Sequence, residues 1–285
     1  MLKHLCVAVV AVCFVAQAAM AADNARGKNF ATFRVGGIEV VALLDAVGVN
    51  EGKVDLLIGA GEDDLKRAAE DGALKTSINA FVVKLNGKTI LFDTGLPIAQ
   101  SGGIMPALAR AGLAPDQIDA VVITHFHFDH VGGLVHRGAK VYPNAELFVP
   151  RVEVNKWSDP GTDFLLTYNV RTNAFEDGAE ILPGVTAMAA YGHTPGHTIF
   201  MLESEGKKLL VIGDLIHLPG VQLVNPDVAV TYDTNPSRAV ASRKRVFAKA
   251  AAEQLPVASM HIPFPGVGVL SADGAGYTFK ELDAE

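Results

Sequence analysis

Runs of apolar residues, separated by glycine and polar turns, predict a chain in which strands dominate. Many of these runs are rich in valine and isoleucine, which favour strands over helices. Asn86-Gly87, between two of the runs, is the sequence expected of a tight hairpin turn. We predict strands at 33–44, 78–85, 88–92, 118–123, 145–149, 185–190, 198–203 and 209–212.

Helical patterns are interspersed with these strands, at 62–69, at 105–111 and from Asn235-Pro236 to about residue 254. The last helix opens on a capping residue followed by proline, a typical helix start. Its predicted apolar stripe is Val240, Phe247 and Ala251. Its basic residues are expected on a solvated face; these are Arg238, Arg243, Lys244, Arg245 and Lys249. Strands mixed with helices indicate an α/β fold with function in the loops at one edge.

The beginning of the chain has the pattern of a secretory signal peptide. A positive start, an apolar run from Leu5 to Ala16 and the small residues around Ala19-Met20-Ala21 follow one another. Such a run is too short for a membrane span, which needs roughly 20 apolar residues. We therefore expect residues 1–21 to be removed, leaving 22–285 as a single domain in the periplasm or outside the cell. No membrane partner is expected after that cleavage.

Composition and charge remove several other classes of protein. The net charge is −7, and an acidic surface argues against nucleic acid as a partner. Both cysteines, Cys6 and Cys13, lie in the predicted signal peptide. The mature chain therefore has no disulfides and no thiolate metal ligands.

Histidine and aspartate gather in one short stretch after the strand predicted at 118–123. His125, His127, Asp129 and His130 fall within six residues. In an extended segment, alternate side chains share a face, and a turn at Asp129 lets His130 reach a neighbouring point. Imidazole and carboxylate are ligands for divalent metals. The stretch therefore indicates a metal site rather than a solvated polar loop.

The order His125-x-His127-x-Asp129-His130 resembles the signature of the metallo-β-lactamase-fold hydrolases. Further motifs of that family follow in its order along the chain: "ILFDTG" at 90–95, "GHTPGH" at 192–197, "VIGD" at 211–214 and "MHIPFPG" at 260–266. The stretch 191–277 is similar to the secreted branch that contains methyl parathion hydrolase and related lactone and aryl-ester hydrolases. The resemblance implies a four-layer αββα sandwich of two mixed β-sheets with outer helices.

This resemblance also implies a set of metal ligands. His125, His127 and His193 would hold one divalent ion, and Asp214 would bridge it to a second. The ligands implied for the second ion are Asp129, His130 and His261. Zinc is the first expectation, with manganese, cobalt and iron as alternatives that suit the same donors. Asp93 and His197 are expected to pack behind the ligands and orient them.

Two bridged metals lower the pKa of a bound water, so that hydroxide becomes available at neutral pH. We expect this hydroxide to attack a lactone or aryl ester, with organophosphate triester hydrolysis as a side activity. Asp129 and Asp214 would take part in catalysis. His217, three residues after Asp214, would hydrogen-bond the substrate or protonate the leaving group. An exposed loop histidine is the alternative for His217.

Aromatic residues near the motifs predict a small apolar or aromatic substrate. Phe128, Trp157 and Phe264 are candidates for the pocket wall, although core packing is an alternative for each phenylalanine. His136 is expected at the surface. Two other functions stay open: a β-lactamase, which Asp214 disfavours, and a periplasmic metal-binding protein without catalysis. By analogy with related enzymes, a homodimer is a further hypothesis.

Overall fold

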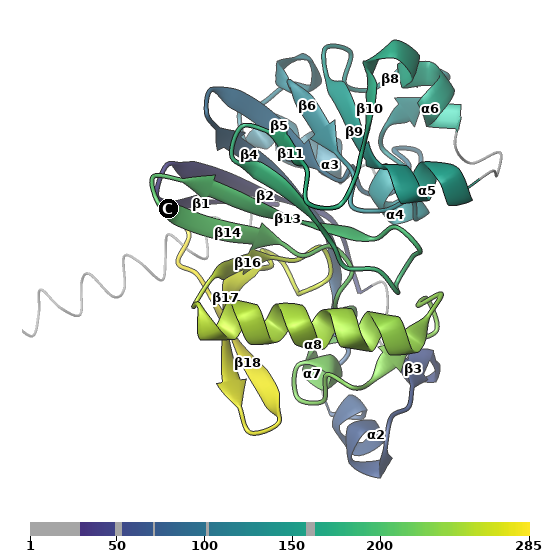
Figure 1. Cartoon of the computed structure of the whole chain (residues 1–285), viewed down its shortest axis with the longest axis vertical. Coiled ribbons are helices and arrows are strands. Elements are labelled where there is room, and N and C mark those ends of the chain that lie inside the picture. Colours follow the sequence, from purple (N-terminus) through teal and green to yellow (C-terminus); the bar gives the residue numbers. More distant parts are fainter. Residues whose placement is uncertain (1–28, 49–52, 71, 101–102, 158–162) are drawn as a thin grey trace, which may run out of the picture.

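The structure is a computed structural model, in which residues 29–48, 53–70, 72–100, 103–157 and 163–285 are described. The predicted signal peptide, residues 1–21, lies outside them. Two seven-stranded mixed sheets pack face to face across a shared apolar core. Helices cover the outer faces of both sheets, as Figure 1 shows. The predicted four-layer αββα sandwich is therefore confirmed.

The first sheet contains the earlier strands of the chain. Its order is β1-β2-β4-β5-β6-β9-β10. Strands β5, β6, β9 and β10 pair in parallel, whereas the pairs from β1 to β5 are antiparallel. The bounds of these strands are β1 (Phe30–Val35), β2 (Ile38–Val47), β4 (Ser77–Leu85), β5 (Lys88–Phe92), β6 (Ala120–Val122), β9 (Glu146–Pro150) and β10 (Thr172–Phe175).

The second sheet contains the later strands, in the order β11-β12-β13-β14-β16-β17-β18. Only the β14 and β16 pair is parallel; the other neighbours are antiparallel. The bounds of these strands are β11 (Glu180–Leu182), β12 (Val185–Ala189), β13 (Thr198–Ser204), β14 (Lys207–Val211), β16 (Pro256–Ala258), β17 (Val267–Asp273) and β18 (Gly276–Glu281). Two small sheets pair β3 (Leu57–Ile58) with β15 (Ala229–Val230) and β7 (Val135–His136) with β8 (Ala139–Lys140).

Three apolar cores hold these layers together. One lies between the two sheets, where Phe33 and Phe92 meet Phe200. Another lies between the first sheet and its helices, and a third between the second sheet and α8. The α-helices are α2 (Glu62–Ala68), α3 (Ile104–Arg110), α4 (Phe128–Val131), α5 (Arg151–Lys156), α6 (Asp163–Tyr168), α7 (Pro219–Gln222) and α8 (Pro236–Ala252), with 3₁₀ turns η1 (Val54–Leu56), η2 (Pro115–Gln117) and η4 (Asn169–Arg171). None of the helices in the described ranges is long and apolar enough to cross a membrane.

Two predictions about the fold need correction, and the first concerns the strand expected at 33–44. A turn at Gly36-Gly37 divides that stretch between β1 and β2, and Val35 pairs with Ile38 across it. Gly36 has a φ of +60°, and a Cβ there would lie 2.7 Å from Lys207. The turn therefore depends on glycine, both for its backbone angle and for the close approach.

The second correction concerns the buried face of α8. Phe247 is buried, but Val240 and Ala251 are only half-buried. Arg243, expected on the solvated face, is 1% exposed and donates to the backbone carbonyls of Leu215, Pro226 and Val228. Its charge is tolerated inside the protein because carbonyl oxygens solvate it. The residues that α8 buries are Ala239, Ser242, Arg243, Val246, Phe247 and Ala250.

Strand direction brings the polar motifs together at one edge. Because β5 and β6 are parallel, the segments after them leave the first sheet on the same side. In the second sheet β12, β14 and β16 all run in one direction. Each of these strands is followed by a histidine or aspartate of the sequence motifs. Side chains far apart in the chain therefore meet where the two sheets end.

Candidate metal centre

Seven side chains converge at this common edge, and Asp214 lies among them. Its carboxylate follows β14, and its Oδ2 lies 3.2 Å from His193 Nε2 and 3.1 Å from His261 Nε2. Its Oδ1 lies 3.2 Å from His130 Nε2. Ligand atoms on a tetrahedral zinc ion, each about 2.1 Å from the metal, lie about 3.4 Å from one another. The spacing around Asp214 therefore fits donors that surround a metal.

The potential ligand atoms fall into groups whose members lie within 4.8 Å of one another. One group combines the alternating histidines of the loop after β6 with His193 and Asp214. Another combines the end of that loop with His261. The groups are His125, His127, His193 and Asp214; Asp129, His130 and His261; and Asp214, His217 and His261. All seven ligands that the sequence predicts are therefore brought together, with His217 beside them.

The first sheet orients two of these histidines through neighbouring oxygens. His130 Nδ1 lies 2.7 Å from Asp93 Oδ2, and His125 Nδ1 lies 3.0 Å from Thr124 Oγ1. Asp93 also accepts from the backbone N–H and the hydroxyl of Thr124. Because each Nδ1 is taken up behind the site, the Nε2 atom is the one left to bind a metal.

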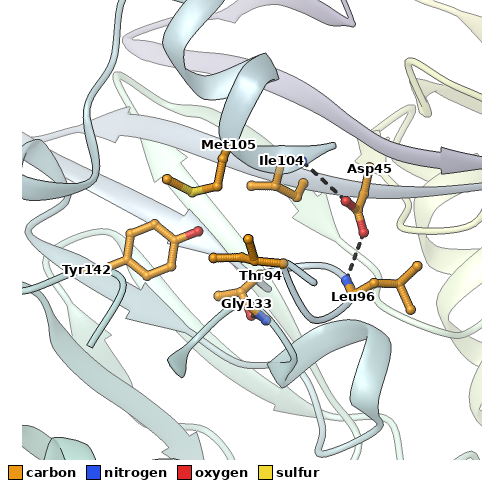
Figure 2. A pocket seen from close by; sticks show the side chains of 8 residues that line it. Asp45, Thr94, Leu96, Ile104, Met105, Gly133 and Tyr142 are labelled. Carbon is orange, nitrogen blue, oxygen red and sulfur yellow. Dashed lines mark hydrogen bonds between the residues drawn. The ribbon is translucent and has the colours of Figure 1, made fainter. Parts of the chain in front are cut away.

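The segment that carries Asp93 is itself fixed from two sides. Asp45, at the end of β2, accepts from the backbone N–H groups of Leu96 and Ile104, as Figure 2 shows. Thr94 donates its hydroxyl to the carbonyl of His130, and the N–H of Gly133 donates to that hydroxyl. The loop after β5 and the histidine loop after β6 therefore form one hydrogen-bonded unit.

The histidines that follow strands of the second sheet are oriented by more distant parts of the chain. His193 Nδ1 lies 3.0 Å from Asp233 Oδ1, which comes from the segment before α8. His261 Nδ1 lies 3.0 Å from the backbone oxygen of Ser77 in β4. In both residues Nε2 again faces Asp214. Four imidazoles from two sheets thus present the same nitrogen toward one point.

Buried atoms without a hydrogen bond test whether this cluster suits a metal. His125 Nε2, His130 Nε2 and Asp214 Oδ1 are buried and lack a hydrogen-bond partner among the described residues. Buried polar atoms are normally hydrogen-bonded, so three such atoms at one point need an explanation. A coordinated cation would satisfy all three, and nitrogen and oxygen donors suit zinc and related divalent metals.

The charges of the cluster lead to the same conclusion. Burial alone raises the pKa of Asp214, but the imidazoles of His130, His261 and His125 outweigh it and hold that pKa well below its usual range. Burial disfavours a charged His193, yet its hydrogen bonds to Asp214 and Asp233 raise its pKa to about 9. The carboxylates therefore favour positive charge at this point, and a metal would displace protons to supply it.

Residues 74–256 match the metallo-beta-lactamase superfamily, which is more than half of the chain. The chain belongs to this superfamily. The resemblance seen in the sequence is therefore confirmed. Membership accounts for the two facing sheets.

Lactonases are among the proteins that are similar to this chain in sequence. An N-acyl homoserine lactonase of a Bacillus species is 33% identical over 149 residues, or 43% of this chain and 58% of that protein. One from Bacillus cereus is 23% identical over 163 residues, covering 49% of this chain and 63% of that protein. The matches thus span about three fifths of these relatives.

Two solved structures are similar over most of the chain. AbOPH, a hydrolase of the beta lactamase superfamily, is 28% identical, with a TM-score of 0.80 over 89% of this chain and 97% of its own. AidC, a dizinc quorum-quenching lactonase solved with a product, N-hexanoyl-L-homoserine, is 25% identical, with a TM-score of 0.82 over the same shares. A two-metal lactonase with this fold thus exists among the neighbours of this superfamily member.

His217 is buried, at 2% exposure, so the alternative of an exposed loop histidine is wrong. Its Nε2 lies 3.1 Å from Asp214 Oδ2, and its ring stacks on that of His261 at a centroid distance of 5.0 Å. Burial lowers the pKa of His217 to about 4. The imidazole is therefore neutral at pH 7 and lies against the same carboxylate as the ligands.

His197 lies behind the ligands. It donates from Nδ1 to the carbonyl of Ala190 and accepts from the backbone N–H of Asp214 at Nε2. Gly213 must lack a side chain, because a Cβ there would lie 2.5 Å from His197 Nε2. His197 therefore holds the backbone of Asp214 in place.

A cavity of about 210 Å³ opens beside the cluster. Phe128 forms part of its wall and is 62% exposed. The ring of Trp157 lies 5.9 Å from that of His127, but Trp157 does not line this cavity. The residues that line it are His127, Phe128, Asp129, His193, Asp214, His217, Tyr232 and His261.

Phe264 was expected in the pocket wall, and this expectation is wrong. It lines a different groove, together with Ile262 and Phe279, and packs against the core between the sheets. Core packing, the alternative stated for Phe264, is what the structure shows. His136 is half-buried in β7 rather than fully exposed.

Several residues around the centre were not found from the sequence. Tyr232 lines the cavity, with its ring 5.9 Å from that of His217, and the adjacent Asp233 bonds His193. Both follow the short strand β15, so the rule that polar residues after an apolar run are candidates would have found them. Glu153, 0% exposed in α5, carries no such signal because its helix reads as a surface element.

Proposed function

We propose that the protein is a dinuclear metal-dependent hydrolase that opens lactones and cleaves aryl esters. The observation that carries this proposal is the position of Asp214, whose carboxylate faces imidazoles from both sheets. One carboxylate between two groups of candidate ligands is an arrangement that suits a pair of bridged metals. The lactonase relatives and the dizinc neighbour support the same chemistry.

The proposed ligands divide into two sets. His125, His127 and His193 would hold one ion, and Asp214 would be shared. The other ion would be held by Asp129, His130 and His261. We propose zinc, since AidC is a dizinc enzyme, while the nitrogen and oxygen donors also suit manganese, cobalt and iron. When bound, such a pair of ions supplies an activated water at neutral pH and polarises the substrate carbonyl.

The chain's own residues then place the substrate and handle protons. Asp129 lines the cavity, and its partly exposed carboxylate can accept a proton from the attacking water. His217 contacts the carboxylate of Asp214 through its Nε2 and also lines the cavity. Because its pKa is about 4, His217 suits a hydrogen bond to the substrate better than protonation of a leaving group at neutral pH.

The cavity fits a small substrate with apolar parts. Its volume is about 210 Å³, and the side chains in its wall that are not proposed ligands are Phe128, His217 and Tyr232. Two aromatic rings beside a carbonyl-binding point suit the acyl chain of a lactone or the ring of an aryl ester. An organophosphate triester would meet the same groups, and we propose its hydrolysis as a weaker side activity.

Export and assembly complete the proposal. The apolar run after Lys3 supports removal of residues 1–21 as a signal peptide, which leaves the domain 22–285 in the periplasm or outside the cell. The mass of the protein recovered outside the cytoplasm tests this, because an unprocessed chain would contradict it. We also propose a homodimer, by analogy with related enzymes, and sedimentation at several concentrations tests it.

A panel of substrates on the zinc-loaded protein tests the proposed function. We expect turnover of dihydrocoumarin and of N-hexanoyl homoserine lactone, weak turnover of methyl parathion, and little of the β-lactam nitrocefin. Nitrocefin turnover without lactone turnover would show a β-lactamase instead. A protein that binds two zinc ions and hydrolyses none of the four would favour a metal-binding role. In the same panel His217→Leu should raise KM for lactones, and an unchanged KM would remove His217 from substrate binding.

A further inference from the structure

We propose that Glu153 is a positioning residue that fixes the distance between the two loops carrying the ligands of one metal. This inference rests on the proposed dinuclear function and adds a residue that the family motifs do not contain. Glu153 lies in α5, the short helix after β9, and is 0% exposed. It touches no proposed ligand side chain through its hydrogen bonds, so its effect would be exerted through the backbone.

The two oxygens of Glu153 bond two different loops. Oε2 accepts from the backbone N–H of Phe126 at 3.1 Å, and Oε1 accepts from that of Gly196 at 2.5 Å. Phe126 stands between His125 and His127 in the loop after β6. Gly196 stands between His193 and His197 in the loop after β12. One carboxylate therefore joins the segment that carries two ligands to the segment that carries the third.

These loops belong to different sheets, and among the described residues one further backbone hydrogen bond joins them, beside the 2.9 Å contact between the ring nitrogens of His193 and His127. The backbone N–H of Thr198 donates to the carbonyl of Thr124 at 3.0 Å, where the two loops leave their strands. Glu153 adds a second connection, at Phe126 on the first loop and at Gly196 on the second. Each of these positions is two residues from the Thr124 and Thr198 bond. A single backbone hydrogen bond would let the loops pivot about it, whereas two also fix the angle between the loops. The position of His193 relative to His125 depends on that angle.

The chemical identity of Glu153 also needs an explanation. A buried carboxylate is unfavourable, and burial raises the pKa of Glu153 even though the Thr194 hydroxyl and the N–H groups of Gly196 and Phe126 counteract it. An apolar side chain would fill the same space without that penalty. The carboxylate is suited to one task that an apolar group cannot perform, which is to accept two backbone N–H bonds at once.

Gly196 gives independent support for a close approach. A Cβ on Gly196 would lie 2.7 Å from the backbone nitrogen of Glu153 and 2.8 Å from its Oε1. Either the loop or the carboxylate would have to move. The second glycine of the "GHTPGH" motif therefore has a physical reason, since it allows α5 and the ligand loop to meet. Gly196→Ala is a way to weaken the tie without changing Glu153.

The proposal predicts a selective effect on one metal. The ion held by His125, His127 and His193 depends on the alignment of the two tied loops. The other ion relies on His130 and His261, which are oriented by Asp93 and by the backbone of Ser77. Loss of an orienting partner typically weakens metal binding about 10- to 100-fold. We expect that loss at one ion and less than about a threefold change at the other.

The test titrates zinc into metal-free wild type, Glu153→Gln and Gly196→Ala, with histidine side-chain nitrogen NMR and a competing chelator as readouts. Glu146→Gln, an exposed change on β9, is the matched control. In both variants, we expect the signals of His125, His127 and His193 to need 10- to 100-fold more free zinc than in wild type. The signals of His130 and His261 should shift at the wild-type concentration.

Equal zinc affinities in wild type and both variants would overturn the role of Glu153. A parallel loss at both ions, together with a lower melting temperature of the metal-free variants, would show general structural damage and would also overturn it. The proposed function fails differently, because a wild type that binds fewer than two zinc ions contradicts the dinuclear site whatever the variants do. In that case, the change in zinc affinity caused by Glu153→Gln at the remaining site would still test whether Glu153 holds the two loops together.

Discussion

The two sheets contribute to the candidate metal centre in contrasting ways. The first sheet presents four candidate ligands on one loop. They lie within six consecutive residues, 125–130, shortly after the end of β6. The second presents His193, Asp214 and His261 singly, each after a different strand. A ligand group that is contiguous in sequence needs one well-placed loop. A dispersed group needs strands of the correct direction, order and packing.

The supports of the two ligand groups differ in the same way. Asp93, which orients His130, belongs to a neighbouring strand end of the same sheet. Asp233, which orients His193, lies in the segment before α8, and buried Arg243 of α8 binds the carbonyl next to Asp214. The contiguous group is thus stabilised locally. The dispersed group depends on α8. The basic residues of that helix suggest a solvated surface, so the sequence does not reveal its buried contacts.

Asp214→Asn gives the largest expected effect, because this side chain is the point where the two ligand groups meet. An amide cannot bridge two cations as a carboxylate does, so kcat for lactones should fall by about 10³-fold or more. Steady-state kinetics and metal content at saturating zinc measure this. Asp63→Asn, on an exposed residue of α2, is the control. Near-normal activity in Asp214→Asn would mean that the groups act separately.

Arg243→Met tests whether the dispersed group depends on α8. The change removes the donor to the carbonyls of Leu215 and Pro226 and one of two donors to that of Val228, which keeps the Gln222 amide. We expect the free energy of unfolding to fall by about 3–5 kcal/mol, the range for breaking a buried charged interaction. Urea unfolding of the metal-free protein measures it. Arg245→Met, at an exposed position of the same helix, should cost less than about 1 kcal/mol.

Asp93→Asn and Asp233→Asn compare the two supports directly. Each removes the carboxylate that fixes one histidine tautomer, so each should weaken one ion about 10- to 100-fold. The affected ion should differ: the one bound by His130 in Asp93→Asn, and the one bound by His193 in Asp233→Asn. Stepwise zinc dissociation constants measure this. The same ion weakened in both variants would contradict the division into two groups.

His197→Gln tests the tie behind Asp214 through its pH dependence. Burial, with the charge of His193, lowers the pKa of His197 to about 3, so the neutral ring stabilises the fold above about pH 6.5. This stability is lost as the pH falls from 6.5 toward 3. The free energy of unfolding of metal-free wild type should therefore fall more steeply than that of the variant, by about 1.4 kcal/mol per pH unit. His136→Gln should retain the wild-type slope.

The sequence predicts the cluster of candidate ligands better than it predicts the residues around that cluster. Each proposed ligand comes from a motif at a strand end, and strand direction is enough to bring these motifs to one edge. The helices at 62–68, 104–110 and 236–252 and the hairpin at Asn86-Gly87 also match the sequence patterns closely. Such features depend on local periodicity, capping and turn chemistry, which the sequence displays directly.

The errors occur where long-range packing decides. Phe264 could face the site or the core, and only the path of the chain after His261 separates the two. Arg243 has the polar character of a surface residue, yet carbonyls from two other segments surround it. Glu153 resembles any charged residue of an amphipathic helix. In each case the deciding partners are distant in sequence, so no local pattern reveals them.

The location of the ligands at the seam between the sheets has a thermodynamic consequence. An ion bound to donors from both sheets would be a cross-link that exists only in the folded state. Binding of this kind adds stability with the logarithm of the free metal concentration, about 1.4 kcal/mol for each tenfold excess over the dissociation constant at each site. The heat tolerance of this protein would then report the metal supply of its surroundings, as well as the quality of its own packing.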